Sequence, residues 1–334
     1  MDFRRNPIGN SSMNKFDLND LEQEALSYLQ NTGALQDTPI ERLHYMNPAA
    51  VEIYKENGID LYTDPLEIAL CAQHNNGGFA VDKWWQSNIP HTFIVGEMAG
   101  THGVKRPGGS ALNAGQVGSI RAAEYIVNVH STDTPDYQTS SRKNEIDKVL
   151  EQCIGKLDNL NRSDSSTTPD QALMWIQERM TTSAGHIRQI DDARQALLNA
   201  KKLLEQIKKN GFTLENNSDL IKAVRAEHIA LASIGYLKAV VELLEQGSGS
   251  RGSHLVLADD GNEIHPDVLD KSTGRPLKYK PENPALRETI LRLQYDPEAE
   301  DMFACETVPV RPMPRDHRAF EPAWRDYREG KIFT

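Results

Sequence analysis

The sequence predicts an α+β or α/β fold in which a strand–glycine loop–helix unit precedes a helical domain and an irregular C-terminal tail. The first observation is an apolar run at residues 91–95, which leads into a glycine-rich stretch at 96–109 and then a helical pattern at 110–127. The second is a set of segments between residues 144 and 245 whose apolar residues recur every three or four positions. The third is the Pro- and charge-rich composition after Gln246, which favours a tail that wraps a surface without forming a core.

The N-terminal region is predicted to be mostly helical. Residues 20–29 and 47–57 carry apolar residues at helical spacing, and Gly33 and Gly58 follow them as stop signals. Residues 66–72 (LEIALCA) form a short apolar run before the polar turn HNNGG, as expected of a strand that enters a tight turn.

Four helices are predicted for the helical domain. They cover residues 144–157, 169–180, 187–209 and 217–245. Thr168 and Ser218 are expected to begin two of them, because hydroxyl side chains cap helix N-termini. The Ser/Thr/Asp/Pro-rich stretches at 131–141 and 161–169 are predicted linkers, and residues 254–258 after the last helix are a predicted strand.

The composition is that of an ordinary globular protein, with 38% hydrophobic and 25% charged residues. Its 48 acidic residues against 37 basic ones give a net charge of −11, which argues against a general affinity for nucleic acid. Cys71, Cys153 and Cys305 form no CxxC pair, so we expect neither a disulfide framework nor a metal centre. No apolar run has the length of a signal-peptide core or of a membrane span, and the expected location is cytoplasmic.

The one literal GxGxxG match, at residues 247–252, stands in the wrong context for a dinucleotide-binding loop. Such a loop needs a strand before it and a helix after it, so that the pyrophosphate meets a helix N-terminus. Here a long predicted helix precedes the match and a predicted strand follows it. We therefore interpret Gly247 as the stop signal of that helix.

Residues 96–112 (GEMAGTHGVKRPGGSAL) have the context that the GxGxxG match lacks. The paired Gly108 and Gly109 permit a backbone to approach a flat ligand, and the amides of the following turn lie at the positive end of the helix dipole. Reduction of a flavin places negative charge at the N1 and O2 side of its ring, which such a helix end would stabilise. The residues alone leave open a glycine-rich turn that holds only a phosphate, or nothing.

This stretch resembles the GE…HGxNRxGGxSL segment of the fumarate reductase/succinate dehydrogenase flavoproteins and the L-aspartate oxidases. The matching positions are Gly96, Glu97, His102, Gly103, Arg106, Gly108, Gly109 and Leu112. The preceding elements agree in order, with a His-x-x-Gly-Gly-like turn from His74 to Gly78 and then a predicted strand. The resemblance implies an FAD-dependent oxidoreductase.

The resemblance also implies which residues hold the isoalloxazine side of FAD. Glu97 would hydrogen-bond the ribityl or ribose hydroxyls, and the amides of Ala111 and Leu112 would face the pyrimidine edge of the flavin. The other cofactor-binding positions that it implies are Gly96, Gly108, Gly109 and Ser110.

Arg106 matches the arginine that grips a substrate carboxylate in the family, a task that suits its planar, bidentate guanidinium. A structural salt bridge is the alternative for it. His74 is the second catalytic residue implied, but two residues separate it from Gly77 where the reductases have three. Gln73 is therefore the alternative at the substrate-facing place, and a glutamine binds without shuttling protons. His102 either lines the same loop or serves packing.

Further departures from the family pattern allow a substrate other than a C4-dicarboxylate. Lys105 replaces the asparagine of the family's NR pair, and Pro107 stiffens the loop. Residues 250–254 (SRGSH) resemble the SRGxH piece that follows the helical domain in the superfamily, which makes the GxGxxG match a landmark of the C-terminal region. Arg251 is expected there to pair with an acidic residue or to approach the substrate pocket.

In the family, a GxGxxG Rossmann half and most of a cap domain precede this region, and neither is found in the sequence. The expected division is 1–65, end of the cap domain; 66–130, C-terminal part of the FAD-binding domain; 131–143, linker; 144–246, helical domain; 247–334, C-terminal extension. We therefore expect a fragment or a split subunit whose partners are an N-terminal Rossmann half, a small-molecule substrate and an electron-donor protein. The alternative is a non-catalytic interaction subunit that keeps an empty flavin scaffold.

Overall fold

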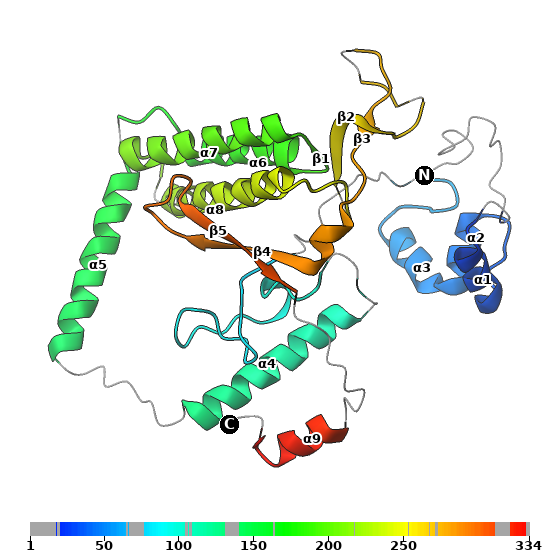
Figure 1. The fold of residues 1–334 in the computed structure, drawn as a ribbon, viewed down its shortest axis with the longest axis horizontal. Coiled ribbons are helices and arrows are strands. Elements are labelled where there is room, and N and C mark those ends of the chain that lie inside the picture. Colours follow the sequence, from blue (N-terminus) through cyan, green and yellow to red (C-terminus); the bar gives the residue numbers. More distant parts are fainter. Residues whose placement is uncertain are drawn as a thin grey trace. The chain divides into compact units, whose positions relative to one another are not determined.

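The computed structural model describes residues 18, 21–64, 66, 77–103, 106, 109–130, 140–162, 164–216, 218–252, 254–266, 268–270, 273–310 and 321–331. The chain divides into two compact units, Met1–Cys71 and Ala72–Thr334, and each is described by itself (Figure 1). The finer division of the sequence into five parts stays a prediction.

The described residues of the first unit form three short helices. They are α1 (Gln23–Thr32), α2 (Pro39–Met46) and α3 (Pro48–Glu56). The helices predicted at 20–29 and 47–57 are confirmed as α1 and α3. Gly33 ends α1 in the left-handed region at φ 70°, which glycine adopts without steric cost. The helix α2 is not among those predicted from the sequence, although Thr38 and Glu41 form a capping box at its start.

In the second unit the glycine-rich stretch leads into a helix, as predicted. A single 3-10 turn, η2 (Gly96–Met98), is followed by α4 (Ser110–Val129). The strand predicted at residues 91–95 is wrong, because this segment forms only an isolated bridge between Phe93 and Gln86. His91, at φ 62°, interrupts the extended backbone where the run begins. The strand predicted at 66–72, apart from residue 66, lies outside the described residues.

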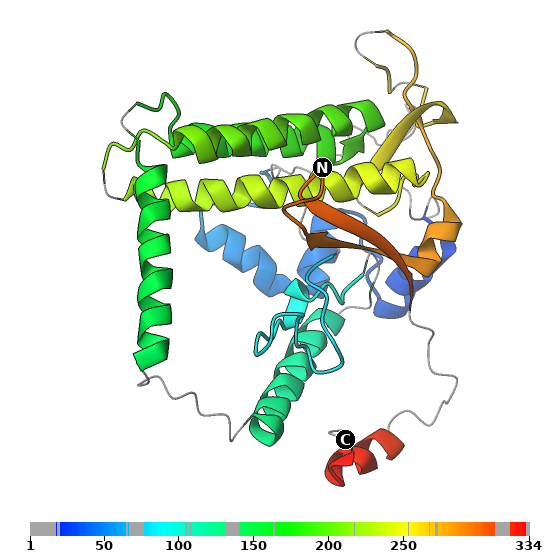
Figure 2. The ribbon, with the colours of Figure 1, turned by 60° about the vertical axis from the view of Figure 1, so that its left-hand side comes forward.

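Four helices form the predicted helical domain. They are α5 (Ser140–Leu160), α6 (Pro169–Ala184), α7 (Ile190–Asn210) and α8 (Asp219–Glu245). The last three lie side by side in both views (Figures 1 and 2) and bury a shared core, to which α5 contributes only Leu160 at its end. Thr168 begins α6 through a capping box with Gln171, as its position predicts, whereas Ser218 precedes α8 without a side-chain cap bond.

Alanines allow the three packed helices to approach closely. Each helix has at least one fully buried alanine, since Ala172 on α6, Ala200 on α7 and Ala226 on α8 are all 0% exposed. Larger side chains fill the remaining space, and the largest of those that are fully buried are Phe212, Leu204, Ile234 and Leu237. Burial of one apolar stripe on each of these helices is therefore the main contribution to the stability of the helical domain.

Leu204→Ala is expected to destabilise this core by about 2–5 kcal/mol, because it removes buried methyl groups and leaves a cavity. Leu198→Ala, on the same helix, is the matched control, since the Leu198 side chain is 49% exposed. Urea unfolding followed by circular dichroism measures both variants. Equal unfolding midpoints would contradict this account of the core.

A small sheet joins the ends of α6 and α8. Its order is β1 (Ile187–Arg188), β2 (Leu255–Glu263) and β3 (Lys278–Tyr279). The helix predicted to start at residue 187 is wrong at this end, because residues 187–188 extend to pair in parallel with β2 and α7 begins only at Ile190. The strand predicted at 254–258 is confirmed, since it overlaps the first part of β2.

The C-terminal tail is not irregular, contrary to prediction. It contains η3 (Pro284–Glu288), an antiparallel hairpin of β4 (Thr289–Tyr295) and β5 (Phe303–Pro309), and α9 (Glu321–Arg328). The hairpin lies against α8 (Figure 2, orange beside yellow-green), where Phe303 packs on the helical core and Gly235 leaves room for its ring. Lys201 and Lys238 both pair with Asp301 in the hairpin turn, at 2.9 and 3.3 Å.

Candidate functional site

Two predicted parts of the site, the turn that ends at Gly78 and the glycine-rich loop, meet in the structure. Gly78 and Ala99 form an isolated antiparallel bridge, and the amide of Phe79 donates to the carbonyl of Met98 at 2.7 Å. A Cβ on Gly78 would collide with the Met98 carbonyl and with the Gly100 amide. Glycine is therefore required here to hold the two segments in backbone contact.

The start of the loop packs against α4. Gly96 lies at φ 70°, and a Cβ added to it would come within 3.9 Å of the Cα of Gly115 on that helix. The amide of Gly100 donates to the Glu97 carbonyl at 2.9 Å, which tightens the turn. Glycines on the loop and on the helix thus allow the two backbones to approach closely.

The N-terminus of α4 is open. Gly109 precedes the helix at φ 78°, and no atom of the described residues lies within 4 Å of the place that a Cβ on it would occupy. The first helical bond runs from the Asn113 amide to the Gly109 carbonyl, so the amides of Ala111 and Leu112 have no acceptor within the helix. The N-cap residue is Gly109, which has no side chain to cap this end. The arrangement offers donors and a positive helix end to a negatively charged group.

An aromatic platform holds α4 in place. Trp84 is 5% exposed, its ring stacks on Tyr125 with centroids 5.1 Å apart, and the Arg121 guanidinium lies 5.0 Å from the Trp84 centroid. The neighbouring Trp85 packs against Gly118, where a Cβ would come within 2.7 Å of ring atoms. This platform fixes the direction of α4 relative to the segment that precedes the loop.

Gly118→Ala is expected to destabilise this packing by about 1–3 kcal/mol, because the added methyl group overlaps the Trp85 ring. Gly155→Ala on α5 is the matched control: its Cβ would meet nothing within 4 Å, and it should stabilise that helix by about 0.5–1 kcal/mol. Urea unfolding and tryptophan emission measure both. An unshifted emission and midpoint in Gly118→Ala would contradict the proposed contact.

The described site residues differ in their surroundings. Glu97 is exposed and Arg106 is partly buried, and each interacts with other groups. His102 is partly buried, and both of its ring nitrogens are shielded without a hydrogen-bond partner. An unsatisfied buried polar group costs about 1–3 kcal/mol, so a hydrogen-bonding ligand group would stabilise the loop at His102. The other predicted residues, Gln73, His74, Lys105, Pro107 and Gly108, lie outside the described residues.

An exposed apolar face of α4 adjoins the loop. Leu112, Val117, Ile120 and Val127 are between 53% and 76% exposed and fall on one side of the helix. Exposed apolar side chains grouped on one side of a helix are typical of contact with another protein or with a ligand. This face is not predictable from the sequence, because helical periodicity does not tell which partner covers an apolar stripe.

The SRGxH piece lies between a helix and a strand, and its arginine pairs with an acidic residue, as predicted. Gly247 follows α8 at φ 82° and β2 comes next, so the GxGxxG match lacks the strand–loop–helix order of a dinucleotide site. The Nε of Arg251 pairs with Glu282 at 2.9 Å. The expected pairing of Arg251 with an acidic residue is therefore confirmed.

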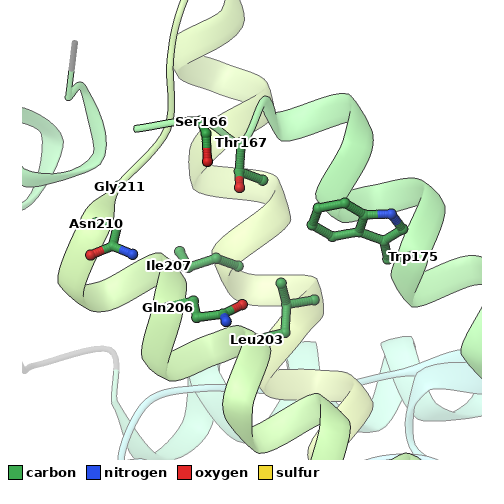
Figure 3. A pocket seen from close by; sticks show the side chains of 8 residues that line it. All are labelled: Ser166, Thr167, Trp175, Leu203, Gln206, Ile207, Asn210 and Gly211. Atoms are coloured by element: carbon green, nitrogen blue, oxygen red, sulfur yellow. The ribbon is translucent and has the colours of Figure 1, made fainter. Parts of the chain in front are cut away.

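A groove of about 270 Å³ lies on the helical domain, between α6, α7 and the loop before α6 (Figure 3). Its lining is uncharged and consists of Ser166, Thr167, Trp175, Leu203, Gln206, Ile207, Asn210 and Gly211. None of the predicted site residues lines it. The sequence carried no signal for it, because polar residues on exposed helix faces are ordinary.

Several other features of the described residues bear on the function. Cys153 and Cys305 are free thiols. No group of three or more His, Cys, Asp or Glu side chains in the described ranges is placed to hold a metal ion. Among the helices that the structure describes, none has the length and apolar character needed to cross a membrane.

Comparison with known proteins identifies relatives that are longer than this chain. No family model matches the sequence. One subunit of the fumarate reductase (CoM/CoB) of Methanothermobacter marburgensis is 26% identical over 218 residues, which are 63% of this chain and 36% of that protein. The L-aspartate oxidase of Streptomyces coelicolor is 26% identical over 151 residues, 45% of this chain and 24% of the oxidase.

Comparison of the fold identifies a solved structure of the same kind. A chain of the Mycobacterium smegmatis Sdh1 complex in the apo form has a TM-score of 0.55 and 20% identity, over 82% of this chain and 42% of its own length. This likeness supports the α+β fold. The chain described here spans less than half the length of each of these three proteins.

Proposed function

We propose, from the premise that this chain is a partial-length member of the fumarate reductase/succinate dehydrogenase flavoprotein superfamily, that it supplies the isoalloxazine and substrate side of an FAD-dependent oxidoreductase. When bound, FAD would supply hydride transfer at its N5 to or from a small substrate that carries a carboxylate. The observation that carries the proposal is the open N-terminus of α4 directly after the glycine-rich loop.

The described residues fit the pyrimidine edge of a flavin. Among the described residues the space over Gly109 is clear, and this N-cap glycine has no side chain to cap α4, so a flat group can approach the amides of Ala111 and Leu112. The positive end of the helix stabilises negative charge there by about 0.3–1 kcal/mol. The remaining residues that we propose to hold the cofactor are Gly96, Glu97, Gly108 and Ser110.

Arg106 is proposed to hold the substrate carboxylate through two parallel N–H···O bonds, which a lysine cannot reproduce. His74 or Gln73 is proposed to face the same substrate. The bridge between Gly78 and Ala99 supports this pairing, because it brings the turn after His74 onto the loop that carries Arg106. A histidine at that place can donate a proton, and a glutamine only a hydrogen bond.

A Rossmann-type unit is proposed to hold the adenosine and pyrophosphate of FAD, and an electron-donor protein to exchange electrons with the flavin. The aligned part of this chain covers 36% of the related reductase chain and 24% of the related oxidase. The exposed face of α4 supports such a partner. Burial of Val117, Ile120 and Val127 would contribute about 25 cal/mol for each Å² removed from water.

A non-catalytic interaction subunit is the second candidate, and α5 favours it. Ile146, Val149, Leu150 and Ile154 are 47–56% exposed and recur at three- and four-residue spacing along this helix. An amphipathic helix with this spacing is able to dock in the groove of a partner. Turnover by a reconstituted complex separates the candidates, because an interaction subunit would leave it insensitive to Arg106→Ala.

The experiment that tests the proposal is a measurement of flavin retention. The purified chain and the chain mixed with a dinucleotide-binding partner are compared by flavin absorbance per polypeptide. Stoichiometric flavin on the chain alone would refute the shared site. A colourless complex would refute the assignment of the cofactor.

A further inference from the structure

A basic cluster surrounds the glycine-rich turn at residues 247–252, which the proposed function does not use. Arg188 belongs to β1, Lys280 follows β3, and Arg251 lies in the turn itself. Among the described residues neither Arg188 nor Lys280 has an ion-pair partner, although both are only partly exposed. A partly buried cation without a counter-charge is unfavourable, so an anionic group beside it would be stabilising.

Arg188 and Lys280 lie on opposite sides of the strand β2. Arg188 lies opposite Val256 in the β1–β2 register, and on the other side the Lys280 amide donates to the Val256 carbonyl at 2.8 Å. Residues that are neighbours across a sheet lie on the same face of it, so Arg188 and Lys280 flank Val256 on one face. The Nζ of Lys280 lies 3.8 Å from the position that a Cβ on Gly247 would take. Its charge is therefore next to the start of the turn.

The turn is folded tightly onto the same strands. The Ser250 amide donates to the Lys280 carbonyl at 2.9 Å, and the Ser250 Oγ accepts from the Val256 amide at 2.9 Å. A Cβ on Gly249 would collide with the Pro281 carbonyl. The turn is thus held rigidly beside both cations, which lowers the conformational cost of binding a ligand there.

Among the described residues, some positive charges of this cluster are paired with a carboxylate, and others are not. Glu282 pairs with both Arg251 and Arg287, so one carboxylate serves two guanidinium groups. The Nε of Arg188 donates to the carbonyls of Ala184 and Gly185 at the end of α6, each at 3.1 Å, and these carbonyls carry no full charge. The described residues around the turn therefore hold an excess of positive charge.

The excess of positive charge affects the pKa of His254. Its backbone bridges that of Arg251, and its imidazole donates to the Gly249 carbonyl. Burial, followed by the positive charges of Arg188 and Arg251, lowers the pKa of His254 to about 4. The ring is therefore neutral at pH 7, and a bound anion nearby would raise this pKa.

We propose that the turn at residues 247–252, together with Arg188, Lys280 and Arg251, binds a phosphate-type oxyanion. A tetrahedral oxyanion presents oxygens in several directions and can meet donors from β1, from the turn and from the residue after β3 at once. Glycine-rich turns and cationic side chains are the donors that proteins use for phosphate. None of these residues belongs to the loop at 96–112, so the proposal stands or falls independently of the flavin.

The test uses the full chain without flavin, and inorganic phosphate is the probe. The protonation of His254 is followed by NMR of its imidazole at increasing pH. We expect saturating phosphate to raise the protonation constant of His254 about tenfold or more, because an opposite charge favours the imidazolium form. Potassium chloride at equal ionic strength controls for screening, and nitrate, which stays ionised at this pH, tests a planar anion in place of a tetrahedral one.

Lys280→Gln should abolish the response to phosphate, and Arg188→Gln should do so as well if that variant folds despite its lost bonds to α6. Arg292→Gln in β4 is the matched control, since Arg292 pairs with Glu306 on an exposed hairpin. It should keep the full response. A wild-type chain whose His254 keeps the same protonation constant in phosphate, or responds equally to chloride or nitrate, would overturn the proposal.

Discussion

The isolated chain should be purified with little or no FAD and should gain stoichiometric flavin when a Rossmann-type partner is added. The residues proposed to contact the cofactor, at 96–112, reach only its isoalloxazine and ribityl part. A charged pyrophosphate that loses two hydrogen bonds of about 1.5 kcal/mol or more each loses about 3 kcal/mol of binding. The partner is therefore expected to tighten FAD binding about a hundredfold or more, as measured by quenching of flavin fluorescence.

Gly109→Val makes this experiment specific to the open end of α4. Its side chain would fill the clear space over the helix and would be strained at φ 78°, so the reconstituted complex should lose its flavin. Gly58→Val is the matched control, because Gly58 has a similar φ of 80° and also has no neighbour within 4 Å of its Cβ position. It carries the same backbone strain in the first unit. A flavin that remains bound in Gly109→Val would contradict the placement of the isoalloxazine ring.

Helices were predictable from the sequence because their signals are local. The apolar spacing in α6, α7 and α8 marks one face of each helix, and Thr168 before Pro169 marks a start. The start of α7 was misplaced, because residues 187–188 are recruited by β2, which lies more than sixty residues later in the chain. Local propensity does not contain such a pairing.

The hairpin β4–β5 was missed for a related reason. Residues 289–295 (TILRLQY) alternate between more and less exposed positions, but the surrounding prolines and charges hid this short pattern. The hairpin is positioned by Phe303 against Gly235 and by two lysines that share Asp301, which are contacts between distant parts of the chain. At residues 91–95 the error is the opposite one, since the apolar run predicts a strand where the structure has only an isolated bridge from Phe93, with His91 at φ 62° interrupting the extended backbone.

The candidate site shows the same limit. The sequence indicated which glycines lie in the loop and that a helix follows it, because both depend on adjacent residues. It did not indicate that Gly78 meets Ala99, or that Trp85 packs on Gly118, since these contacts join separate segments. The cations around residues 247–252 are a further example, because Arg188, Arg251 and Lys280 are brought together only by the three-stranded sheet.

Arg106→Ala in the reconstituted complex is expected to lower kcat/KM by about 10²–10³-fold with little change in FAD content. A guanidinium that holds a carboxylate through two bonds contributes about 1.5 kcal/mol or more for each bond. Since 1.36 kcal/mol corresponds to a factor of ten in rate, the loss of both bonds accounts for the expected decrease. Steady-state kinetics with a carboxylate-bearing substrate, and flavin absorbance on the same sample, provide the measurement.

Two further variants separate a substrate contact from a structural salt bridge at Arg106. Arg106→Lys keeps the charge but not the planar fork, so it should recover only part of the activity. Arg142→Ala, which removes an exposed arginine at the start of α5, should leave kcat/KM unchanged. A substrate analogue without the carboxylate should be a poor substrate for the unaltered complex and should lose little more with Arg106→Ala, because the bonds in question are already absent. An equal loss for both substrates, or a loss of FAD with the activity, would instead assign Arg106 to a structural salt bridge.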